Sequence, residues 1–377
     1  MDKRILGYLE DHHADMLSDL QTLVKAESPS TDKVLLDRTA NVVKDLLMAS
    51  GFEVSTICQE TGGDHIRGRL VGADPTADPI LILAHYDTVW KVGTLDDIPF
   101  SVQGGIVRGP GVFDMKAGLV QAVWAVRALR MVGGVRRPIV FLSNSDEEIG
   151  SIYSRGLIEE EARRAAVALV FEASHHGALK TSRKGTCLYT WHIYGKAAHA
   201  GLDPKAGISA IEELADQVVA LRSLANDAAG TTVNVGVIQG GTRSNVVAAE
   251  VTAAIDVRVA TSEEAERVIY YMESLQPIRE GIRLEVVGGL NRPPMERTPS
   301  VVEVFRLAQR IGRELGLELT EASVGGASDG NFCAAMGVPV VDGLGAVGNG
   351  AHAPDEHVLS DTMTTRAALA AALMAEL

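Results

Sequence analysis

Three short runs of continuous apolar residues stand out in the first half of the chain. Runs of this length without alternation predict strands that are buried on both faces of a mainly parallel sheet. The segment 116–131 repeats apolar residues at helical spacing and stops before Gly133, so we expect a helix that connects two parallel strands. Strands that alternate with helices predict α/β architecture. The three predicted strands are residues 80–84, 138–142 and 167–171.

The pattern changes near residue 180. Residues 186–195 are β-branched and aromatic and alternate with a period of two, which predicts a strand of a second sheet. The elements that follow give the order βαββαβ, which is a ferredoxin-like α+β unit. They are a helix at 206–225, strands at 232–238 and 250–259, a helix that opens at Thr261, and a strand at 282–287.

The end of this unit is marked by Gly288-Gly289 and Pro293-Pro294, after which helix and strand patterns resume at 299–315 and 338–342. The simplest arrangement is therefore an α/β domain interrupted by a smaller inserted domain. A chain of 377 residues also exceeds the usual size of a single core. We expect the discontinuous α/β domain to comprise residues 1–180 and 292–377, and the insertion to comprise 181–291.

Composition excludes some partners. A formal net charge of −14 argues against nucleic acid or an anionic membrane surface. The sequence has no apolar run long enough to span a membrane and no apolar leader near residue 1, so we expect a soluble, cytoplasmic protein. Cys58, Cys187 and Cys333 form no C-x-x-C pair and are expected to be reduced thiols.

Several residues that could bind metal follow the predicted strands. Each has an ordinary alternative role when it is taken alone. His85 and Asp87 could end a strand, Asp114 could cap a helix, and adjacent acids after a strand are often solvated. A carboxylate that ends a buried strand is less easily explained in this way. The candidate ligands are His85, Asp114, Glu148, Glu172 and His352, with Glu147 beside them as a candidate base.

Taken together, these residues predict a metal site. In open α/β sheets, ligands bind beyond the carboxyl ends of the strands, which is where His85, Glu148 and Glu172 are expected. Carboxylates with two imidazoles suit two Zn²⁺ ions per subunit, with Co²⁺ or Mn²⁺ as substitutes. One bridging aspartate, with one histidine and one glutamate for each ion and a shared water, would complete two four-coordinate sites. Such a pair of ions activates water and stabilises a developing oxyanion.

Five segments of the chain resemble sequence motifs of the di-zinc aminoacylase/carboxypeptidase family of metallopeptidases. They are AHYDTV (84–89), GVFDMKAG (111–118), SDEEIGS (145–151), FEAS (171–174) and GAHAPDEHV (350–358). The resemblance extends over nearly the whole chain, including the insertion. It implies that His85 and Glu172 hold one zinc, that Glu148 and His352 hold the other, and that Asp114 bridges them. It also implies a cis peptide after Asp114.

The resemblance assigns further roles. Glu147 would be the general base for the water between the metals, and Asp87 would orient His85. His199, in GKAAHAG, would act in the active site of the partner subunit of a homodimer formed through the inserted dimerisation (lid) domain. Asn245 and Arg258 would bind substrate, because an arginine offers a planar fork to a carboxylate. A structural ion pair is the alternative role for Arg258.

Within the family, the motifs are most similar to those of the glutamate carboxypeptidase (carboxypeptidase G) branch, since Glu172 stands where other branches have aspartate. The expected reaction is therefore release of a C-terminal glutamate or related residue from a small N-acyl amino acid or peptide. An N-acyl-amino-acid deacylase of the acetylornithine deacetylase or desuccinylase type, or a dipeptidase, is the alternative. A non-catalytic binding protein on the same scaffold is a remote alternative.

Overall fold

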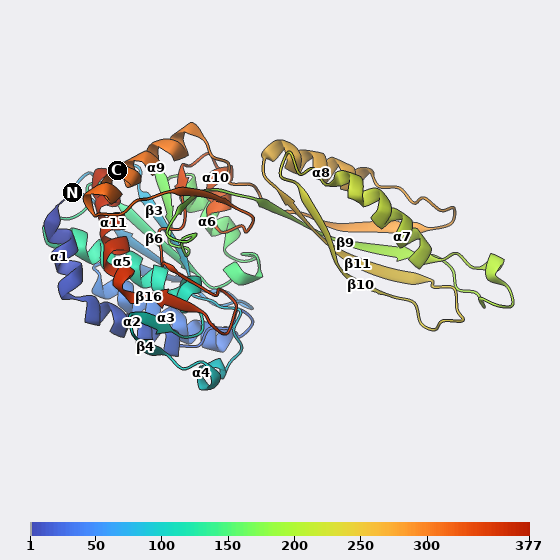
Figure 1. Ribbon diagram of the computed structural model, residues 1–377, viewed down its shortest axis with the longest axis horizontal. Coiled ribbons are helices and arrows are strands. Elements are labelled where there is room, and N and C mark those ends of the chain that lie inside the picture. Colours follow the sequence, from blue (N-terminus) through green and yellow to red (C-terminus); the bar gives the residue numbers. More distant parts are fainter. Residues whose placement is uncertain (1) are drawn as a thin grey trace. The chain divides into compact units, whose positions relative to one another are not determined.

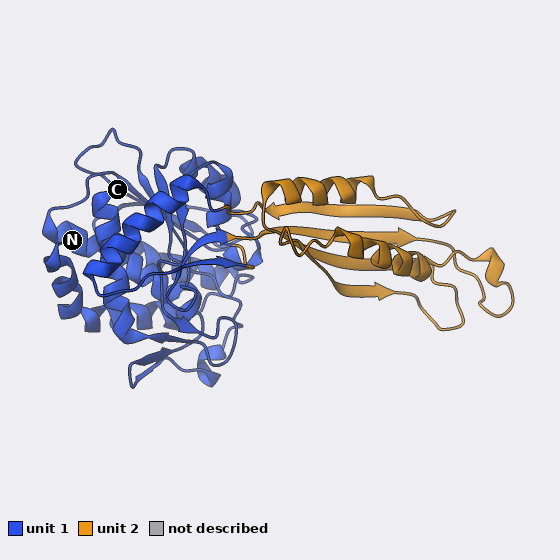
Figure 2. Cartoon of the chain, turned by 45° about the horizontal axis from the view of Figure 1, so that its top comes forward, with its two compact units in different colours: residues 1–182, 297–324, 328–377 blue, residues 183–296, 325–327 orange. Residues whose placement is uncertain are grey.

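The computed structural model describes residues 2–377, and their contacts divide the chain into two compact units (Figure 2). Unit 1 comprises residues 1–182, 297–324 and 328–377, and unit 2 comprises 183–296 with 325–327. Unit 2 is thus an insertion in unit 1, with the short segment 325–327 added to it.

Unit 1 is built on a six-stranded sheet in which five strands run in the same direction and β2 runs opposite to both of its neighbours. The α/β class with a mainly parallel sheet, predicted from the sequence, is confirmed. The three predicted strands are β3, β6 and β7, and they lie side by side at the centre (Figure 1). In sheet order, the strands are β1 (Glu53–Ile57), β2 (His65–Leu70), β6 (Ile139–Asn144), β3 (Ile80–His85), β7 (Val167–Val170) and β14 (Val340–Val341).

Helices and two small sheets surround this central sheet. The longer helices are α1 (Lys3–Asp11), α2 (His13–Lys25), α3 (Lys33–Ala49), α5 (Ala117–Val132), α6 (Arg155–Ala162), α9 (Pro299–Glu314) and α11 (Met363–Glu376). The short ones are α4 (Thr94–Asp97) and α10 (Gly330–Ala335). The small sheets pair β15 (Gly348–Asn349), β16 (His357–Leu359), β5 (Ile106–Arg108) and β4 (Ser101–Gln103) in that order, and β13 (Glu321–Val324) with β8 (Leu179–Arg183).

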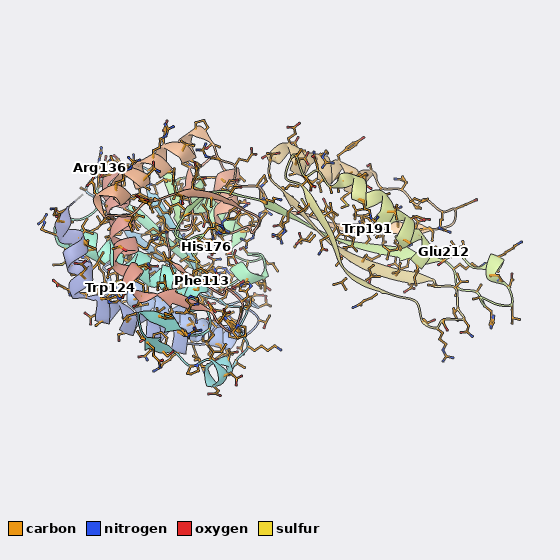
Figure 3. The ribbon with its side chains drawn as sticks, in the orientation of Figure 1. Phe113, Trp124, Arg136, His176, Trp191 and Glu212 are labelled. Atoms are coloured by element: carbon orange, nitrogen blue, oxygen red, sulfur yellow. The ribbon has the colours of Figure 1, made fainter. Side chains whose placement is uncertain are left out.

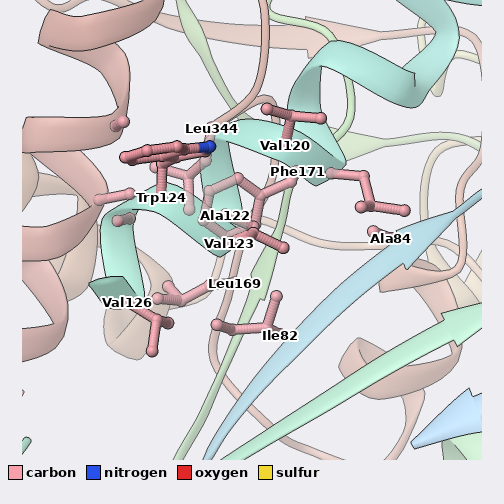
Figure 4. Packing of buried hydrophobic residues seen from close by; sticks show 14 of the residues in the cluster. Ile82, Ala84, Val120, Ala122, Val123, Trp124, Val126, Leu169, Phe171 and Leu344 are labelled. Atoms are coloured by element: carbon pink, nitrogen blue, oxygen red, sulfur yellow. The ribbon is translucent and has the colours of Figure 1, made fainter. Parts of the chain in front are cut away.

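Helix α5 is the predicted connecting helix, and it is buried almost all round. It packs on β3 and against α1 and α11, so apolar residues cover more than one of its faces. Figure 4 shows Val120 and Val123 of α5 close to Ile82 of β3 and to Phe171, which directly follows β7. This packing fixes the start of α5 above the carboxyl ends of β3 and β7.

Two glycines allow a close approach at this point. A Cβ atom on Gly118, in the first turn of α5, would lie 1.9 Å from the carbonyl oxygen of Phe171. One on Gly345 would lie 2.2 Å from the same oxygen. Since real Cβ atoms do not approach an oxygen so closely, only glycine lets these segments pack against the chain that leads into Glu172.

Unit 2 is a four-stranded antiparallel sheet with two longer helices, in the order βαββαβ. The ferredoxin-like insertion that the alternating pattern predicted is therefore confirmed. Thr261 caps α8 through its side chain, as its sequence predicted. Trp191 of β9 is fully buried in the core of this unit (Figure 3). In sheet order, the strands are β10 (Thr232–Gly240), β11 (Glu250–Val259), β9 (Gly185–Tyr194) and β12 (Arg283–Arg292); the helices are α7 (Ala210–Leu221) and α8 (Ser262–Ser274).

Two further predictions concern membrane-spanning helices and the three cysteines. Across residues 2–377, every helix is too short or too polar to cross a membrane. The three cysteines are free, as expected, with Cys58 exposed and the other two buried.

Candidate metal centre

Three of the five candidate metal ligands lie at the carboxyl ends of three adjacent parallel strands. His85 is the last residue of β3, Glu172 follows the end of β7, and Glu148 lies in a single 3-10 turn, Glu147–Ile149, shortly after β6. Because β6, β3 and β7 are neighbours that run in the same direction, their ends meet at one edge of the sheet. This edge is where the apolar strand patterns predicted a site.

Two loops supply the remaining candidates. Asp114 lies in an irregular, kinked turn, Val112–Lys116, that leads into α5, and its peptide bond to Met115 is cis, as the family resemblance implied. His352 lies between β15 and β16 and has a φ of 62°, which is uncommon for a residue with a side chain. Neighbouring structure must hold His352 in this conformation, since it costs free energy locally.

These five side chains form two groups that share Asp114. In the first group, Nε2 of His85 lies 3.4 Å from Oδ1 of Asp114 and 3.5 Å from Oε1 of Glu172. In the second, Nε2 of His352 lies 3.3 Å from Oδ2 of Asp114 and 3.2 Å from Oε1 of Glu148. The two oxygens of Asp114 therefore face different groups, as a bridging carboxylate requires.

The geometry of both groups fits zinc. Ligands about 2.0–2.1 Å from a tetrahedral ion lie about 3.3 Å from one another, which matches the separations in both groups. Nε2 of His85 is buried and makes no well-formed hydrogen bond, although carboxylate oxygens of Asp114 and Glu172 lie 3.4 and 3.5 Å away, so an ion between the three atoms would satisfy it. Imidazole and carboxylate donors are those that zinc, cobalt and manganese accept. Each group could hold one ion with three protein ligands.

The charges in the two groups strongly perturb each other. Hydrogen bonds that His352 donates to the carboxylates of Asp114 and Glu148 raise its pKa to about 10. Burial raises the pKa of Glu148 to about 7, although the hydrogen bond from His352 opposes this shift. Burial also opposes ionisation of Asp114, but His352 and His85 hold the pKa of its carboxyl far below its usual value. Since a metal ion takes the lone pair that a proton occupies on each imidazole, ion binding would release protons.

Asp87 joins the first group to the Glu147–Glu148 turn. Nδ1 of His85 lies 3.3 Å from Oδ1 of Asp87 and 3.0 Å from the carbonyl oxygen of the same residue. The Asp87 carboxylate also accepts the backbone N–H groups of Glu147 and Glu148, both at 3.2 Å, and the hydroxyl of Ser30 at 2.8 Å. Asp87 is fully buried. It can therefore orient the imidazole of His85 and fix the position of the turn that carries Glu148.

A cleft of about 640 Å³ opens in unit 1 beside the second group. Glu148 and Ile149 form one wall, and the segment 88–92 forms another. Val89, Val92 and Ile149 leave apolar surface exposed, and Trp90 adds an aromatic face. A small molecule with an apolar group would find both a hydrophobic wall and a metal ligand in this cleft.

The three candidate residues of the insertion lie within unit 2, where His199 and Asn245 are on neighbouring segments and Arg258 lies apart from them. His199 accepts the backbone N–H groups of Gly201 and Leu202 at Nδ1, and it pairs through its backbone with Val246, next to Asn245. Arg258 lies opposite Thr186, at the far end of β9 from Tyr194. Thr186 and Tyr194 are eight positions apart along β9, or roughly 27 Å.

Arg258 makes a two-point ion pair inside unit 2. Its Nε and Nη2 atoms each lie 2.7 Å from an oxygen of Asp256, and Nη1 donates to the hydroxyl of Thr186. This is the structural alternative considered from the sequence. Part of the guanidinium remains exposed, so the pairing leaves a surface that a further carboxylate could approach.

Sequence reasoning assigned no role to Glu356, although it lies in the GAHAPDEHV segment. Its carboxylate is buried, with 1% of the residue exposed, and it accepts four N–H groups. The only sequence signal was its place four residues after His352. The donors are the indole of Trp90 and the backbone of Gly111, Phe113 and Asp114.

A parallel α/β sheet with two overlapping ligand groups at its carboxyl edge defines a metal-dependent hydrolase. The sequence model of "Peptidase family M20/M25/M40" matches residues 81–376, so the chain belongs to this family and is a metallopeptidase or amidohydrolase. The family implies a dinuclear metal site and peptide or amino-acid substrates.

Known relatives extend over most of the chain. It is 31% identical to carboxypeptidase G2 of Pseudomonas sp. (strain RS-16), over 97% of this chain and 90% of that protein. It is 28% identical to succinyl-diaminopimelate desuccinylase of Ectopseudomonas mendocina, over 84% and 87% of the two chains. Among solved structures, aminopeptidase PepT of Bacillus cereus has the same fold, with a TM-score of 0.77, 23% identity, and coverage of 97% of this chain and 98% of that one.

Proposed function

We propose that the protein hydrolyses an amide bond to release a C-terminal glutamate or a related amino acid, in the manner of a glutamate carboxypeptidase. The proposal that the protein is a hydrolase rests on one observation. Two ligand groups share Asp114, and the atoms in each group have the separations of zinc ligands. The similarity to carboxypeptidase G2 over nearly the full length supports the choice of glutamate.

In this proposal, His85, Glu172 and Asp114 hold one zinc ion, and Asp114, Glu148 and His352 hold the other. The two ions would supply an activated water and a positive charge for the developing oxyanion. Glu147 takes a proton from the attacking water and later delivers it to the nitrogen of the leaving amino acid. Arg258 and Asn245 bind the substrate carboxylate, and His199 contributes a hydrogen bond to the oxyanion.

The acyl part of the substrate would lie in the cleft beside Glu148. Its exposed apolar side chains favour an apolar or aromatic acyl group over a charged one. Lys91, which also lines the cleft, adds a cation that an anionic substituent could meet. The alternatives are an N-acyl-amino-acid deacylase and a dipeptidase, which differ from the proposed activity in the amino acid that is released and in the group attached to it.

A substrate panel tests this function. With zinc present, we expect kcat/KM for N-acyl-glutamates to exceed that for N-acetylornithine and simple dipeptides by about tenfold or more, since one lost charged contact has at least that effect. Activity should disappear on chelation and return with zinc. A higher kcat/KM for N-acetylornithine or for dipeptides would replace the glutamate assignment, and activity retained without bound metal would refute the di-zinc assignment.

We also propose a homodimer formed through unit 2. Strand β10 is an edge of the four-stranded sheet, and Val237 and Ile238 on it are 52% and 57% exposed. An exposed apolar edge strand can pair with another chain. The separation of His199 from Arg258 within unit 2 supports a dimer in which the two residues serve different active sites.

Light scattering should give twice the chain mass of 40.0 kDa. Ile238→Lys should shift the mass towards the monomer, because a charge on a paired edge opposes association. Val287→Lys is the matched control, since Val287 is also 57% exposed and lies on β12, the opposite edge of the same sheet. A monomeric native protein at micromolar concentration would contradict the dimer, and equal effects of the two variants would contradict its placement at β10.

A further inference from the structure

Glu356 is a buried carboxylate that is surrounded by hydrogen-bond donors. Oε2 accepts the indole N–H of Trp90 at 2.8 Å and the backbone N–H of Gly111 at 2.9 Å. Oε1 accepts the backbone N–H groups of Phe113 and Asp114 at 2.8 and 3.0 Å. Hydrogen bonds to an ionised acceptor are stronger than neutral ones, so the three backbone contacts hold the turn at residues 111–114 firmly. That turn carries the shared ligand Asp114.

Glu356 is tied equally closely to His352. The backbone forms two consecutive turns, with hydrogen bonds from Ala353 N–H to Gly350 and from Glu356 N–H to Ala353, both at 2.9 Å. Gly350 has a φ of 82° and lies so near Glu356 that a Cβ on it would be 2.9 Å from the Cα of Glu356. His352, with its unusual backbone conformation, therefore lies within the first of these turns, and Glu356 ends the second.

The same carboxylate thus joins three segments that are distant in the sequence. In the sequence, the donors of the Asp114 turn are 242 to 245 residues away from Glu356, and Trp90 is 266 residues away from it. Trp90 lines the cleft, Asp114 belongs to both ligand groups, and His352 belongs to the second.

A neutral side chain of the same shape cannot replace this carboxylate. All four groups around it are donors, so it needs two acceptor oxygens. Glutamine has one oxygen and one NH₂ group, and the NH₂ group would face either Trp90 and Gly111 or Phe113 and Asp114. Two buried N–H groups would lose their acceptor, and the turn would move to find another one.

We propose that Glu356 is a positioning residue for the metal centre, which sets the distance between Asp114 and His352 and thereby the affinity of the ion that these two residues would share. The inference rests on the metal site in the proposed function. Glu356 acts through the backbone of one ligand and the loop of another, and it contacts no ion or substrate itself. Outer partners that orient metal ligands commonly change metal affinity by about 10- to 100-fold when they are removed.

The test measures zinc affinity in the full chain by competition with a chromophoric chelator of known affinity. Glu356→Gln should weaken zinc binding by about 10- to 100-fold, and saturating zinc should restore most of kcat. Glu213→Gln is the matched control. Glu213 is fully buried and its carboxylate accepts the backbone N–H groups of Ile278 and Arg279 and the amide of Gln217, but it lies in unit 2.

The outcomes separate the two proposals. If both variants lose resistance to denaturation but bind zinc as tightly as the native chain, Glu356 has a purely structural role and the inference is wrong. If the native chain itself fails to bind two zinc ions, the proposed function is wrong instead. Should Glu356→Gln fail to fold, Glu356→Asp, which keeps the charge but is one methylene shorter, is expected to show the same direction of change. Native zinc affinity in that variant would overturn the inference.

Discussion

Glu147→Gln is expected to keep two zinc ions per chain while kcat falls by about 10²- to 10⁴-fold. Glutamine has nearly the same shape as glutamate but cannot accept a proton from water at neutral pH. Glu147 belongs to neither ligand group, so its replacement removes no contact to an ion. Its backbone N–H, which donates to Asp87, is unchanged in the variant. The measurement pairs steady-state kinetics with the zinc content of the dialysed protein.

Glu148→Gln provides the contrast at the next position. Oε1 of Glu148 lies 3.2 Å from Nε2 of His352, so this change removes an anionic member of the second group. We expect it to lose zinc as well as activity. The two variants would then differ in zinc content and would both lose activity. A near-normal kcat for Glu147→Gln at full zinc content would show that a different group takes the proton.

The central part of the fold was predictable because its strands are buried on both faces. The apolar runs at β3, β6 and β7 have no polar positions to interrupt them, and their alternation with helices leaves few other arrangements. Strand β2 was not predicted. Its sequence, HIRGRL, contains two arginines. They can lie in this sheet because they pair with the buried Glu161 of α6, which is 92 to 94 residues away. No local pattern reveals such compensation.

Helix α11 was missed for a different reason. Its sequence, MTTRAALAAALMAE, is rich in alanine and buried on nearly all sides, so it has no polar stripe. Amphipathic periodicity is the main sequence signal of a surface helix, and a fully buried helix lacks it. The same is true of α5, which was recognised because leucines, valines and a tryptophan give it a stronger apolar pattern.

The candidate ligands were visible in the sequence because each follows a strand or lies in a distinctive segment. Of the groups that hold them, Asp87 was predicted as the partner of His85, but Glu356 was not. Glu356 receives three of its four hydrogen bonds from backbone N–H groups, which every residue except proline has, so no residue type indicates the contact. The pairing of Arg258 with Asp256 was within reach, since residues two apart on a strand share a face.

Asp114→Asn is expected to lose both zinc ions and to be at least as inactive as Glu147→Gln. The two oxygens of Asp114 face the two histidines, at 3.4 and 3.3 Å. Asparagine keeps one oxygen, and its NH₂ group is a donor that cannot bind a cation. It also removes the negative charge that both groups share. One group would keep only one imidazole and one carboxylate, and the other would have a neutral amide oxygen in place of the shared carboxylate, so neither would hold zinc stably.

Zinc content after dialysis measures this effect. His85→Ala and His352→Ala are the comparison variants. Each of these histidines belongs to one group, so its loss should weaken the binding of one ion more than that of the other. Asp19→Asn is the control for loss of a charged acceptor in the same unit. Asp19 accepts the indole N–H of Trp124 and pairs with Arg127, away from both groups, so its zinc content should stay at two. If Asp114→Asn retains one tightly bound ion, Asp114 belongs to a single group and the two ions are held independently.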